Sequence, residues 1–409
     1  MRLGSSERFW ITGVLFVFVL LVRCGPENPE RTTPDGDGDG IAIGPRDDGG
    51  IPDASTPDAS MPAPPEPRFQ TTFSLALRES ERVPDVTTYR QVLPSVLAGD
   101  AVRVSFRAGD GGMSLLRATV STAAAPTPVE LPLPEEAKEL APDARITSES
   151  APLLVTPGDP VIITFEVSGT IATSGLQTLP EGAQRGGSHA TVEGPLEGAA
   201  RTRPAGVVAL EVRALPSPIL VALGDSITQG YVSGTDDTRK AWPQLAATEL
   251  EMPFLNAGVS SQGVRLAAEN LDEEVLSLTG ITDCVMLLGT NDLHAFSAEA
   301  LIAELSALFE RMRPHCRVWG ATLLPKERTS AGNLSEVNAV RAAVNAWLRD
   351  EAPVEGVIDF EAALRGGSPD TFAEGLAEDG IHPSVEGQVR MGEAAAAFFR
   401  AQPALTPPE

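Results

Sequence analysis

Three side chains in the C-terminal half of the chain have the chemistry that covalent catalysis needs. Ser226 comes shortly after the apolar run 219–223, and its hydroxyl is a candidate nucleophile. A serine hydroxyl is almost un-ionised at neutral pH, so it needs a positioned general base. Of the 4 histidines, only His382 has a carboxylate three residues upstream on the same predicted loop, and that residue is Asp379. The three residues predict a nucleophilic serine with a histidine base that an aspartate orients.

The predicted surroundings of Ser226 fit this chemistry. Gly224 permits a tight turn between the run 219–223, predicted to be a strand, and a helix that begins after the serine. A helix N-terminus presents free N–H groups and the positive end of its dipole, so an oxyanion formed at Ser226 is expected to be stabilised there. The alternative is that Asp225 and Ser226 only cap this helix.

Three further motifs follow in order: Asn256-Ala257-Gly258, Gly289-Thr290-Asn291-Asp292 and Asp379-Gly380-Ile381-His382-Pro383. Together with Gly224-Asp225-Ser226-Ile227-Thr228 they resemble the four blocks of the SGNH hydrolase superfamily, also called GDSL esterases and lipases, which centre on Ser, Gly, Asn and His. The resemblance covers residues 217 to 400. Three less diagnostic pieces look like the XynE-like branch of xylanase-associated esterases: Ala241-Trp242-Pro243, Ala342-Ala343-Val344-Asn345-Ala346-Trp347 and Val357-Ile358-Asp359-Phe360.

The resemblance implies a role for each of these positions. Ser226, Asp379 and His382 are then the catalytic residues of ester hydrolysis through an acyl-enzyme. The oxyanion hole is implied to consist of the backbone N–H groups of Ser226 and Gly258 and the side-chain amide of Asn291. We expect no cofactor. We also expect no metal site, because the histidines are scattered and the cysteines lack zinc spacing.

The substrate class that this resemblance favours is a glycan ester with a small acyl group, such as acetyl on plant or microbial polysaccharide. Lipid esters, aryl esters and acyl transfer to an acceptor alcohol stay open. A further alternative is a non-catalytic surface protein that binds glycan and whose hydrolase domain has decayed, but the intact Ser226, Asp379 and His382 argue against decay. Asp225 and Asp292, beside catalytic positions, are interpreted as residues that brace their loops.

Residues 69–215 are predicted to form a separate β-rich module. Apolar and polar residues alternate in 102–106 and 161–167, which is the pattern of half-buried strands, and clusters such as 108–112 are predicted to separate strands. We predict an all-β, sandwich-like module. A scaffold that packs on the following domain and a carbohydrate-binding module are the two interpretations of its role.

Residues 217–403 are predicted to form the catalytic domain. Apolar runs at 219–223, 254–257, 281–288, 317–324 and 354–360 alternate with helical stripes, one of which begins after Ser297 as a candidate N-cap. The pattern predicts a three-layer α/β domain with a parallel sheet of flavodoxin-like order. In such sheets functional groups gather at the carboxyl edge of the strands, where the motifs above are expected to lie.

The first 68 residues are predicted to direct export rather than to fold. An apolar run at 9–22 behind two arginines is the layout of a secretory signal over residues 1–24. Cys24 resembles the lipidated cysteine of a bacterial lipoprotein, although Arg23 replaces the small residue expected there, so ordinary cleavage and an uncleaved anchor stay open. Residues 25–68, rich in Pro, Gly and Asp, predict a disordered linker. We therefore expect an exported protein, either a cell-envelope lipoprotein or a secreted enzyme.

Charge and cysteine content limit the partners and the compartment. The formal net charge is −25, which argues against a nucleic-acid partner because phosphate binding needs a basic face. Cys284 and Cys316 are predicted near the starts of two neighbouring parallel strands. An exported protein permits a disulfide between them, and two buried thiols are the alternative.

Overall fold

The computed structural model of the protein describes residues 65–174, 178–179, 181–232, 238–402 and 405. The predicted signal sequence, Cys24 and the predicted linker up to residue 64 lie outside the described residues. No helix in the described part of the chain combines the length and the apolar character needed to cross a bilayer.

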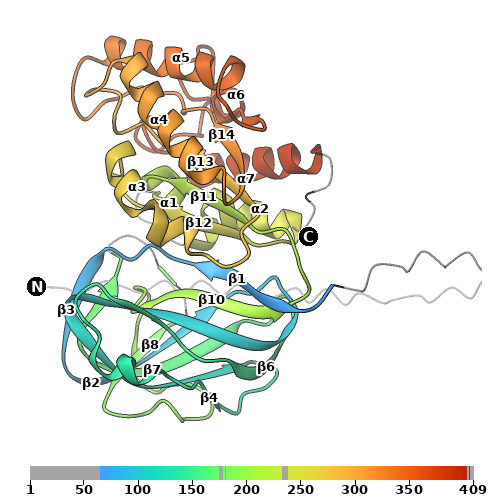
Figure 1. The fold of residues 1–409 in the computed structure, drawn as a ribbon. Helices are drawn as coiled ribbons and strands as arrows, with labels where there is room; N and C mark the ends of the chain where they lie inside the picture. The colour runs from blue at the N-terminus through green and yellow to red at the C-terminus, as the bar shows by residue number, and fades with distance from the viewer. Residues whose placement is uncertain (1–64, 175–177, 180, 233–237, 403–404, 406–409) are drawn as a thin grey trace, which may run out of the picture. The chain divides into compact units, whose positions relative to one another are not determined.

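The first folded region is an antiparallel β module (Figure 1). Its strands pair in the order β1-β10-β3-β7-β2-β8-β9, and β4, β5 and β6 each pair with β3. The first part of β3 pairs with β10 and the rest with β7, so one strand of 24 residues joins the two halves of this strand order. The predicted all-β module is confirmed. Its elements are β1 (Arg68–Ser74), β2 (Glu79–Leu93), β3 (Gly99–Thr122), β4 (Val129–Glu130), the 3-10 helix η1 (Glu135–Glu139), β5 (Arg145–Thr147), β6 (Ala151–Val155), β7 (Val161–Thr173), β8 (Ala183–Gly186), β9 (Ala199–Ala200) and β10 (Val207–Ala214).

The core of the β module contains the residues whose alternation predicted it. Val102, Val104 and Phe106 of β3 are fully buried, as is Phe165 of β7. The ring of Phe165 lies 5.3 Å from that of Phe106 and 5.7 Å from that of Tyr89. Side chains of three strands therefore meet in one core.

The expected break at residues 108–112 is wrong, because β3 runs through them. The register between β3 and β7 shifts within this segment, which is a β-bulge rather than a turn. Glycine is favoured there: a Cβ added to Gly109 would lie 2.8 Å from the backbone carbonyl oxygen of Ile171 in β7. In a strand interior, glycine therefore marks a close approach of two backbones.

The second folded region alternates strands and helices around a five-stranded parallel sheet (Figure 1). The strand order is β12-β11-β13-β14-β15, which is 2-1-3-4-5 along this part of the chain and confirms the flavodoxin-like order. Its elements are β11 (Leu220–Gly224), α1 (Ser226–Gln229), the 3-10 helix η2 (Thr238–Lys240), α2 (Trp242–Leu250), β12 (Phe254–Gly258), α3 (Val264–Leu271), the π-helical turn η3 (Asp272–Leu276), β13 (Asp283–Leu287), α4 (Ala298–Met312), β14 (Arg317–Ala321), α5 (Leu334–Asp350), β15 (Val357–Ile358), α6 (Phe360–Leu364) and α7 (Val385–Arg400).

The helices flank this sheet in two groups (Figure 1). α2 and α6 pack on α7, whereas α3 and α5 pack on α4. Trp242 of α2 meets Phe360 of α6 with 5.0 Å between ring centroids, and Phe309 of α4 meets Trp347 of α5 at 6.1 Å. Because helices cover both faces, every residue of β11, β12 and β13 is buried, and these strands appear in the sequence as apolar runs. The predicted N-cap, Ser297, accepts a hydrogen bond from an N–H in the first turn of α4.

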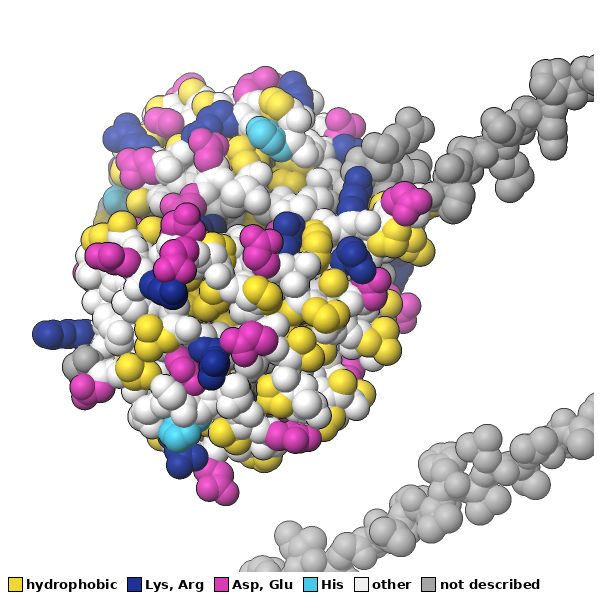
Figure 2. All heavy atoms as spheres, turned by 60° about the horizontal axis from the view of Figure 1, so that its bottom comes forward, with side chains coloured by type: hydrophobic (Ala, Val, Ile, Leu, Met, Phe, Trp, Pro, Cys, Tyr) yellow, Lys and Arg dark blue, Asp and Glu magenta, His cyan; other side chains and the backbone are white. Residues whose placement is uncertain are grey.

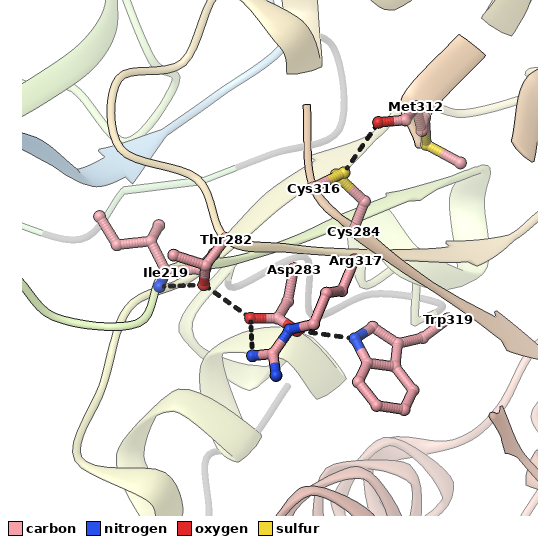
Figure 3. Close-up of a disulfide and its surroundings, with 8 residues drawn as sticks. All are labelled: Ile219, Thr282, Asp283, Cys284, Met312, Cys316, Arg317 and Trp319. Carbon is pink, nitrogen blue, oxygen red and sulfur yellow. Dashed lines mark hydrogen bonds and ion pairs between the residues drawn. A yellow bond between two sulfur atoms is a disulfide. The ribbon is translucent and has the colours of Figure 1, made fainter. Parts of the chain in front are cut away.

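Cys284 of β13 and Cys316, directly before β14, form a disulfide (Figure 3). The two Cα atoms are 5.9 Å apart, as the register of these neighbouring strands allows. Beside the disulfide, Asp283 accepts hydrogen bonds from Arg317 Nη2 at 2.9 Å and Trp319 Nε1 at 2.8 Å. The starts of β13 and β14 are thus joined through side chains as well as through the backbone.

Candidate active site

Ser226 lies on the turn that follows β11, where the sequence places it. Gly224 ends this strand, and a Cβ there would lie 2.1 Å from Thr228 Oγ1 and 2.7 Å from the carbonyl oxygen of Leu287. Only glycine therefore permits so tight a turn. The main-chain N–H of Ser226 meets no protein acceptor within the described residues, so it is available to a ligand.

The helix that follows the turn is short. α1 contains only four residues, so the dipole of a long helix does not support this site. Asp225 caps the turn, because its Oδ1 accepts the N–H of Ile227 at 2.9 Å. Two buried amides hold the same turn from other elements: Asn256 Nδ2 donates to the carbonyl of Thr228 and Gln388 Nε2 to that of Ile227. The position of the serine is fixed by these bonds.

Ser226, His382 and Asp379 form one continuous chain of contacts. Ser226 Oγ lies 2.9 Å from His382 Nε2, and His382 Nδ1 lies 3.0 Å from Asp379 Oδ2. The other carboxylate oxygen of Asp379 accepts the backbone N–H groups of Ile381 and His382 at 2.9 and 2.8 Å. The aspartate therefore fixes both its own loop and the imidazole, and the second ring nitrogen is left to act on the serine hydroxyl.

The Asp379 carboxyl is held in its ionised form. Burial tends to raise its pKa, but the hydrogen bonds from the backbone and ring of His382 and from Ile381 N–H outweigh burial, and the pKa lies below its usual value. An ionised Asp379 accepts the Nδ1–H of His382, which leaves Nε2 as the base.

Asn291 is also brought to this site. It follows β13, lines the same cavity as Ser226 and donates one Nδ2–H to the backbone carbonyl of Gln262 at 3.0 Å. Because an amide nitrogen carries two hydrogens, the second is free for a ligand.

The expectation that Gly258 supplies an oxyanion donor has to be corrected. Its N–H donates to Asn256 Oδ1 at 2.9 Å, and Gly258 is buried and does not line the cavity. The loop residues that do line the cavity are Ser260 and Ser261, and the N–H of Ser261 has no protein acceptor in the described part of the chain. Ser261 has φ 62°, a left-handed conformation that is uncommon for serine, so its residue type gave no signal for this role.

The cavity above Ser226 has a volume of about 350 Å³ and is rich in hydroxyl groups. Among the described residues, no aspartate or glutamate lines it. The hydroxyl-bearing residues are Ser226, Tyr231, Ser260, Ser261, Thr290, Thr329 and Ser330. A larger cavity of about 640 Å³ lies against the β module, but the predicted catalytic residues do not line it. We therefore assign the chemistry to the smaller cavity.

Two residues of the cavity were not singled out from the sequence. Lys326 follows β14, is buried, and donates to Thr290 Oγ1 at 3.0 Å; burial lowers its pKa. The ring of Tyr231 lies 4.5 Å from the ring of His382. Neither residue belongs to a motif of fixed spacing, so only the fold brings them to the site.

Asp225 and Asp292 brace loops, as interpreted from the sequence. Asp292 accepts the N–H of Val264, at the start of α3, at 3.1 Å. Burial raises the pKa of Asp225 to about 7 and that of Asp292 to about 6. Neither carboxylate lines the cavity. In the same described ranges no group of three or more His, Cys, Asp or Glu side chains is arranged to hold a metal ion.

A parallel α/β sheet with a serine, a histidine and an aspartate in contact at its carboxyl edge has the layout of a serine hydrolase. Residues 222–390 match the model of the GDSL-like Lipase/Acylhydrolase family. This part of the chain belongs to that family, and the protein is a carboxylic ester hydrolase. No curated protein matches the chain.

Solved structures similar to this chain include two esterases and a member of the lipolytic G-D-S-L family. A carbohydrate acetylesterase from Sinorhizobium meliloti is 18% identical, with a TM-score of 0.39, and the match covers 45% of this chain and 99% of that one. An aryl esterase from M. smegmatis is also 18% identical, with the same TM-score and the same coverage. A member of the lipolytic G-D-S-L family from Veillonella parvula is 20% identical, with a TM-score of 0.39 and coverage of 46% of this chain and 100% of that one.

Proposed function

We propose that Ser226 is the nucleophile of this esterase, His382 its general base and Asp379 the residue that orients the base. The observation that carries the proposal is the continuous contact from Ser226 Oγ through the imidazole to the carboxylate, at 2.9 and 3.0 Å. A base positioned in this way contributes about 10² to 10⁴ in rate.

The proposed reaction passes through an acyl-enzyme. Ser226 Oγ attacks the ester carbonyl carbon as its proton moves to His382 Nε2, and the Asp379 carboxylate stabilises the imidazolium. The tetrahedral intermediate then expels the alcohol oxygen, which takes the proton from His382. Water attacks the acyl-enzyme with the same base, so the carboxylic acid leaves and the Ser226 hydroxyl is restored.

Three N–H groups are proposed to stabilise the oxyanion. They are the backbone N–H of Ser226, the second side-chain N–H of Asn291 and the backbone N–H of Ser261, which replaces Gly258 in this role. The first and third have no protein acceptor within the described residues, and all three residues line the cavity. Removal of one such donor typically lowers turnover by about 10² to 10³.

The proposed substrate is a small acyl ester, such as acetyl, on a polyhydroxylated alcohol of polysaccharide type. The support is the cavity itself: it is small, its wall carries many hydroxyl groups, and these can exchange hydrogen bonds with sugar hydroxyls. A long lipid chain would instead need an extended apolar wall. The resemblance to the XynE-like branch points to the same substrate class. Aryl esters and transfer of the acyl group to a second alcohol remain as alternative reactions of the same acyl-enzyme.

The alternative of a non-catalytic glycan-binding protein has less support. Glycan binding of that kind uses exposed aromatic faces, and the large exposed hydrophobic residues in the described ranges are leucines and a valine. Figure 2 shows charged side chains of both signs scattered among hydrophobic ones over the face that it presents.

We further propose that the enzyme acts outside the cytoplasm. This rests on the apolar run 9–22 and on Cys24 as a candidate lipidation site. Metabolic labelling of the expressed full chain with a fatty-acid analogue, beside Cys24→Ser, tests it. Label that depends on Cys24 supports a lipoprotein, whereas unlabelled protein in the medium supports ordinary secretion.

Hydrolysis of p-nitrophenyl acetate, butyrate and octanoate by the purified protein tests the catalytic proposal. Ser226→Ala should lower kcat by about 10⁴-fold or more, because no other group replaces the nucleophile. Ser306→Ala is the matched control, since its hydroxyl bonds the carbonyl of Ile302 within its own helix, α4. Acetate is expected to be the best of the three substrates.

Three other outcomes of these assays would change the proposal. A Ser226→Ala variant that keeps its activity would refute the proposed nucleophile. A preference for octanoate would point to lipid esters. If a glycan acceptor is added and acylated sugar accumulates instead of free acid, the enzyme is an acyltransferase.

A further inference from the structure

An arginine of the β module contacts two residues, Glu274 and Gln262, that lie next to the proposed active site. Arg78 lies between β1 and β2, and residues 63–409 form one compact unit. Its Nε and Nη2 donate to the two carboxylate oxygens of Glu274, on the turn η3, at 2.7 and 2.5 Å. The same Nη2 donates to Gln262 Oε1 at 2.6 Å. The side chain of Arg78 is 17% exposed and that of Glu274 2%, so this contact is shielded from water.

Gln262 connects this arginine to two parts of the proposed active site. Its side-chain Nε2 donates to the carbonyl oxygen of Gly224, two residues before Ser226, at 2.7 Å. Its own backbone carbonyl accepts Asn291 Nδ2 at 3.0 Å. Gln262 is completely buried. One residue therefore holds both the end of the strand that carries the nucleophile and an amide proposed to bind the oxyanion.

We propose that Arg78 is a positioning residue of the active site, so that the β module completes the catalytic machinery of the neighbouring domain through Gln262. The inference rests on the proposed function, because it concerns the same nucleophile and oxyanion donors. It also gives the β module a role beyond that of a scaffold or a glycan-binding module.

The chemistry of the two side chains explains why an arginine is needed. A glutamine amide has one accepting and one donating end, which can exchange places by rotation of the amide. A guanidinium only donates, so it can pair only with Oε1 of Gln262 and thereby directs Nε2 toward Gly224. Glu274 binds the guanidinium through two parallel hydrogen bonds and fixes its plane. Without Arg78, Gln262 Oε1 would be buried and unsatisfied, and the amide would lose its fixed orientation.

A second arginine of the β module offers a matched control. Arg145 of β5 pairs with Glu273, the neighbour of Glu274 on η3: its Nε lies 2.7 Å from the carboxylate, and Nη1 donates to the Glu273 carbonyl at 2.6 Å. Both arginines thus join the β module to the same turn. In the described residues only the Arg78 contact continues to Gln262.

The test compares Arg78→Met with Arg145→Met in the full chain, with kcat and KM for p-nitrophenyl acetate and the thermal unfolding midpoint as readouts. Methionine keeps an apolar stem and removes the donors. We expect Arg78→Met to lower kcat by about 10- to 100-fold with little change in KM, because small displacements of catalytic groups have effects of this size. Arg145→Met should lower the unfolding midpoint but leave kcat unchanged.

Two conservative variants keep the test decisive if Arg78→Met does not fold. Arg78→Lys keeps the positive charge but loses the planar fork that binds both Glu274 oxygens in parallel while it donates to Gln262, so kcat should be intermediate. Glu274→Gln keeps an accepting oxygen but loses the charge that fixes the guanidinium, and a smaller loss of kcat is expected.

The inference is overturned if kcat in the Arg78 and Glu274 variants equals that of Arg145→Met and the unfolding midpoints alone differ. Ser226→Ala in the same assay separates the two proposals. An inactive Ser226→Ala beside a fully active Arg78→Met contradicts only the role of Arg78, whereas an active Ser226→Ala contradicts the proposed function itself.

Discussion

The two folded regions use their strands in opposite ways. In the β module, β2, β3 and β7 contain 15, 24 and 13 residues, and they pair along most of their lengths. Among the described residues of the catalytic domain no strand exceeds five residues, and each of the first three ends in a loop that carries a functional or cavity-lining residue. Long strands supply a continuous core, whereas short parallel strands deliver several loops to one edge.

This difference predicts that the two regions respond differently to substitution. Buried side chains of the β module should affect the free energy of unfolding and leave the chemistry unchanged. Side chains at the carboxyl edge of the parallel sheet should affect turnover and leave stability nearly unchanged. Arg78 is the expected exception, because it belongs to the β module and contacts Gln262, which holds two loops of the catalytic domain.

Phe165→Ala in β7 tests the first half of the comparison. The ring is fully buried against Phe106 and Tyr89, so its removal should lower the free energy of unfolding by about 3 to 5 kcal/mol. Denaturant unfolding measures this change, and kcat per folded molecule should stay the same. Leu154→Ala in β6, at a side chain that is 71% exposed, is the control. A large loss of kcat in folded Phe165→Ala would break the comparison.

Asn291→Ala tests the other half. We expect kcat to fall by about 10² to 10³, because a proposed oxyanion donor is lost. Thermal unfolding should change little, since the Asn291 side chain makes one hydrogen bond among the described residues. Asn270→Ala at the end of α3 removes a similar amide that bonds a helix carbonyl and should keep full activity. Equal activity in the two variants would remove Asn291 from the mechanism.

The general fold was predictable because burial leaves a pattern in the sequence. Helices cover both faces of the parallel sheet, so its strands appear as apolar runs, and the half-buried strands of the β module alternate. The exception at 108–112 arises because glycine serves both turns and bulges, and residue type does not distinguish them. The apolar run at 354–360 contains a strand of only two residues, since α6 begins at Phe360.

The site was predictable where a residue follows a strand or keeps a fixed spacing from its partner. Ser226 and Asn291 belong to the first kind, and Asp379 with His382 to the second. The contact between Arg78 and Gln262 spans 184 positions, and nothing local in the sequence indicates it. Contacts between distant segments need the fold, and these are the contacts that support the catalytic loops.

A further prediction concerns the pH dependence of stability, and it contrasts one aspartate from each region. Asp225 is buried beside the nucleophile, and its pKa is raised to about 7, whereas Asp100 of β3 is paired with Arg213 on the surface and its pKa is lowered. A raised pKa means that the folded state binds a proton that the unfolded state releases between pH 3.8 and about 7. The stability of the protein relative to Asp225→Asn should therefore fall as pH rises through this window and stay constant above it.

Asp100→Asn is the control for that experiment. Because the pKa of Asp100 is lowered in the folded state, the ionised carboxylate stabilises the protein above the pKa of the unfolded state. This stabilisation is lost only as pH falls through the folded-state pKa. The difference in the free energy of unfolding between Asp100→Asn and the parent protein should therefore be flat between pH 4 and 8. Urea unfolding at several pH values measures both differences. A flat profile for Asp225→Asn as well would mean that the buried ammonium of Lys326 keeps Asp225 ionised in the folded state. An ionised carboxylate would then cost no more stability at the buried catalytic edge than on the surface of the β module.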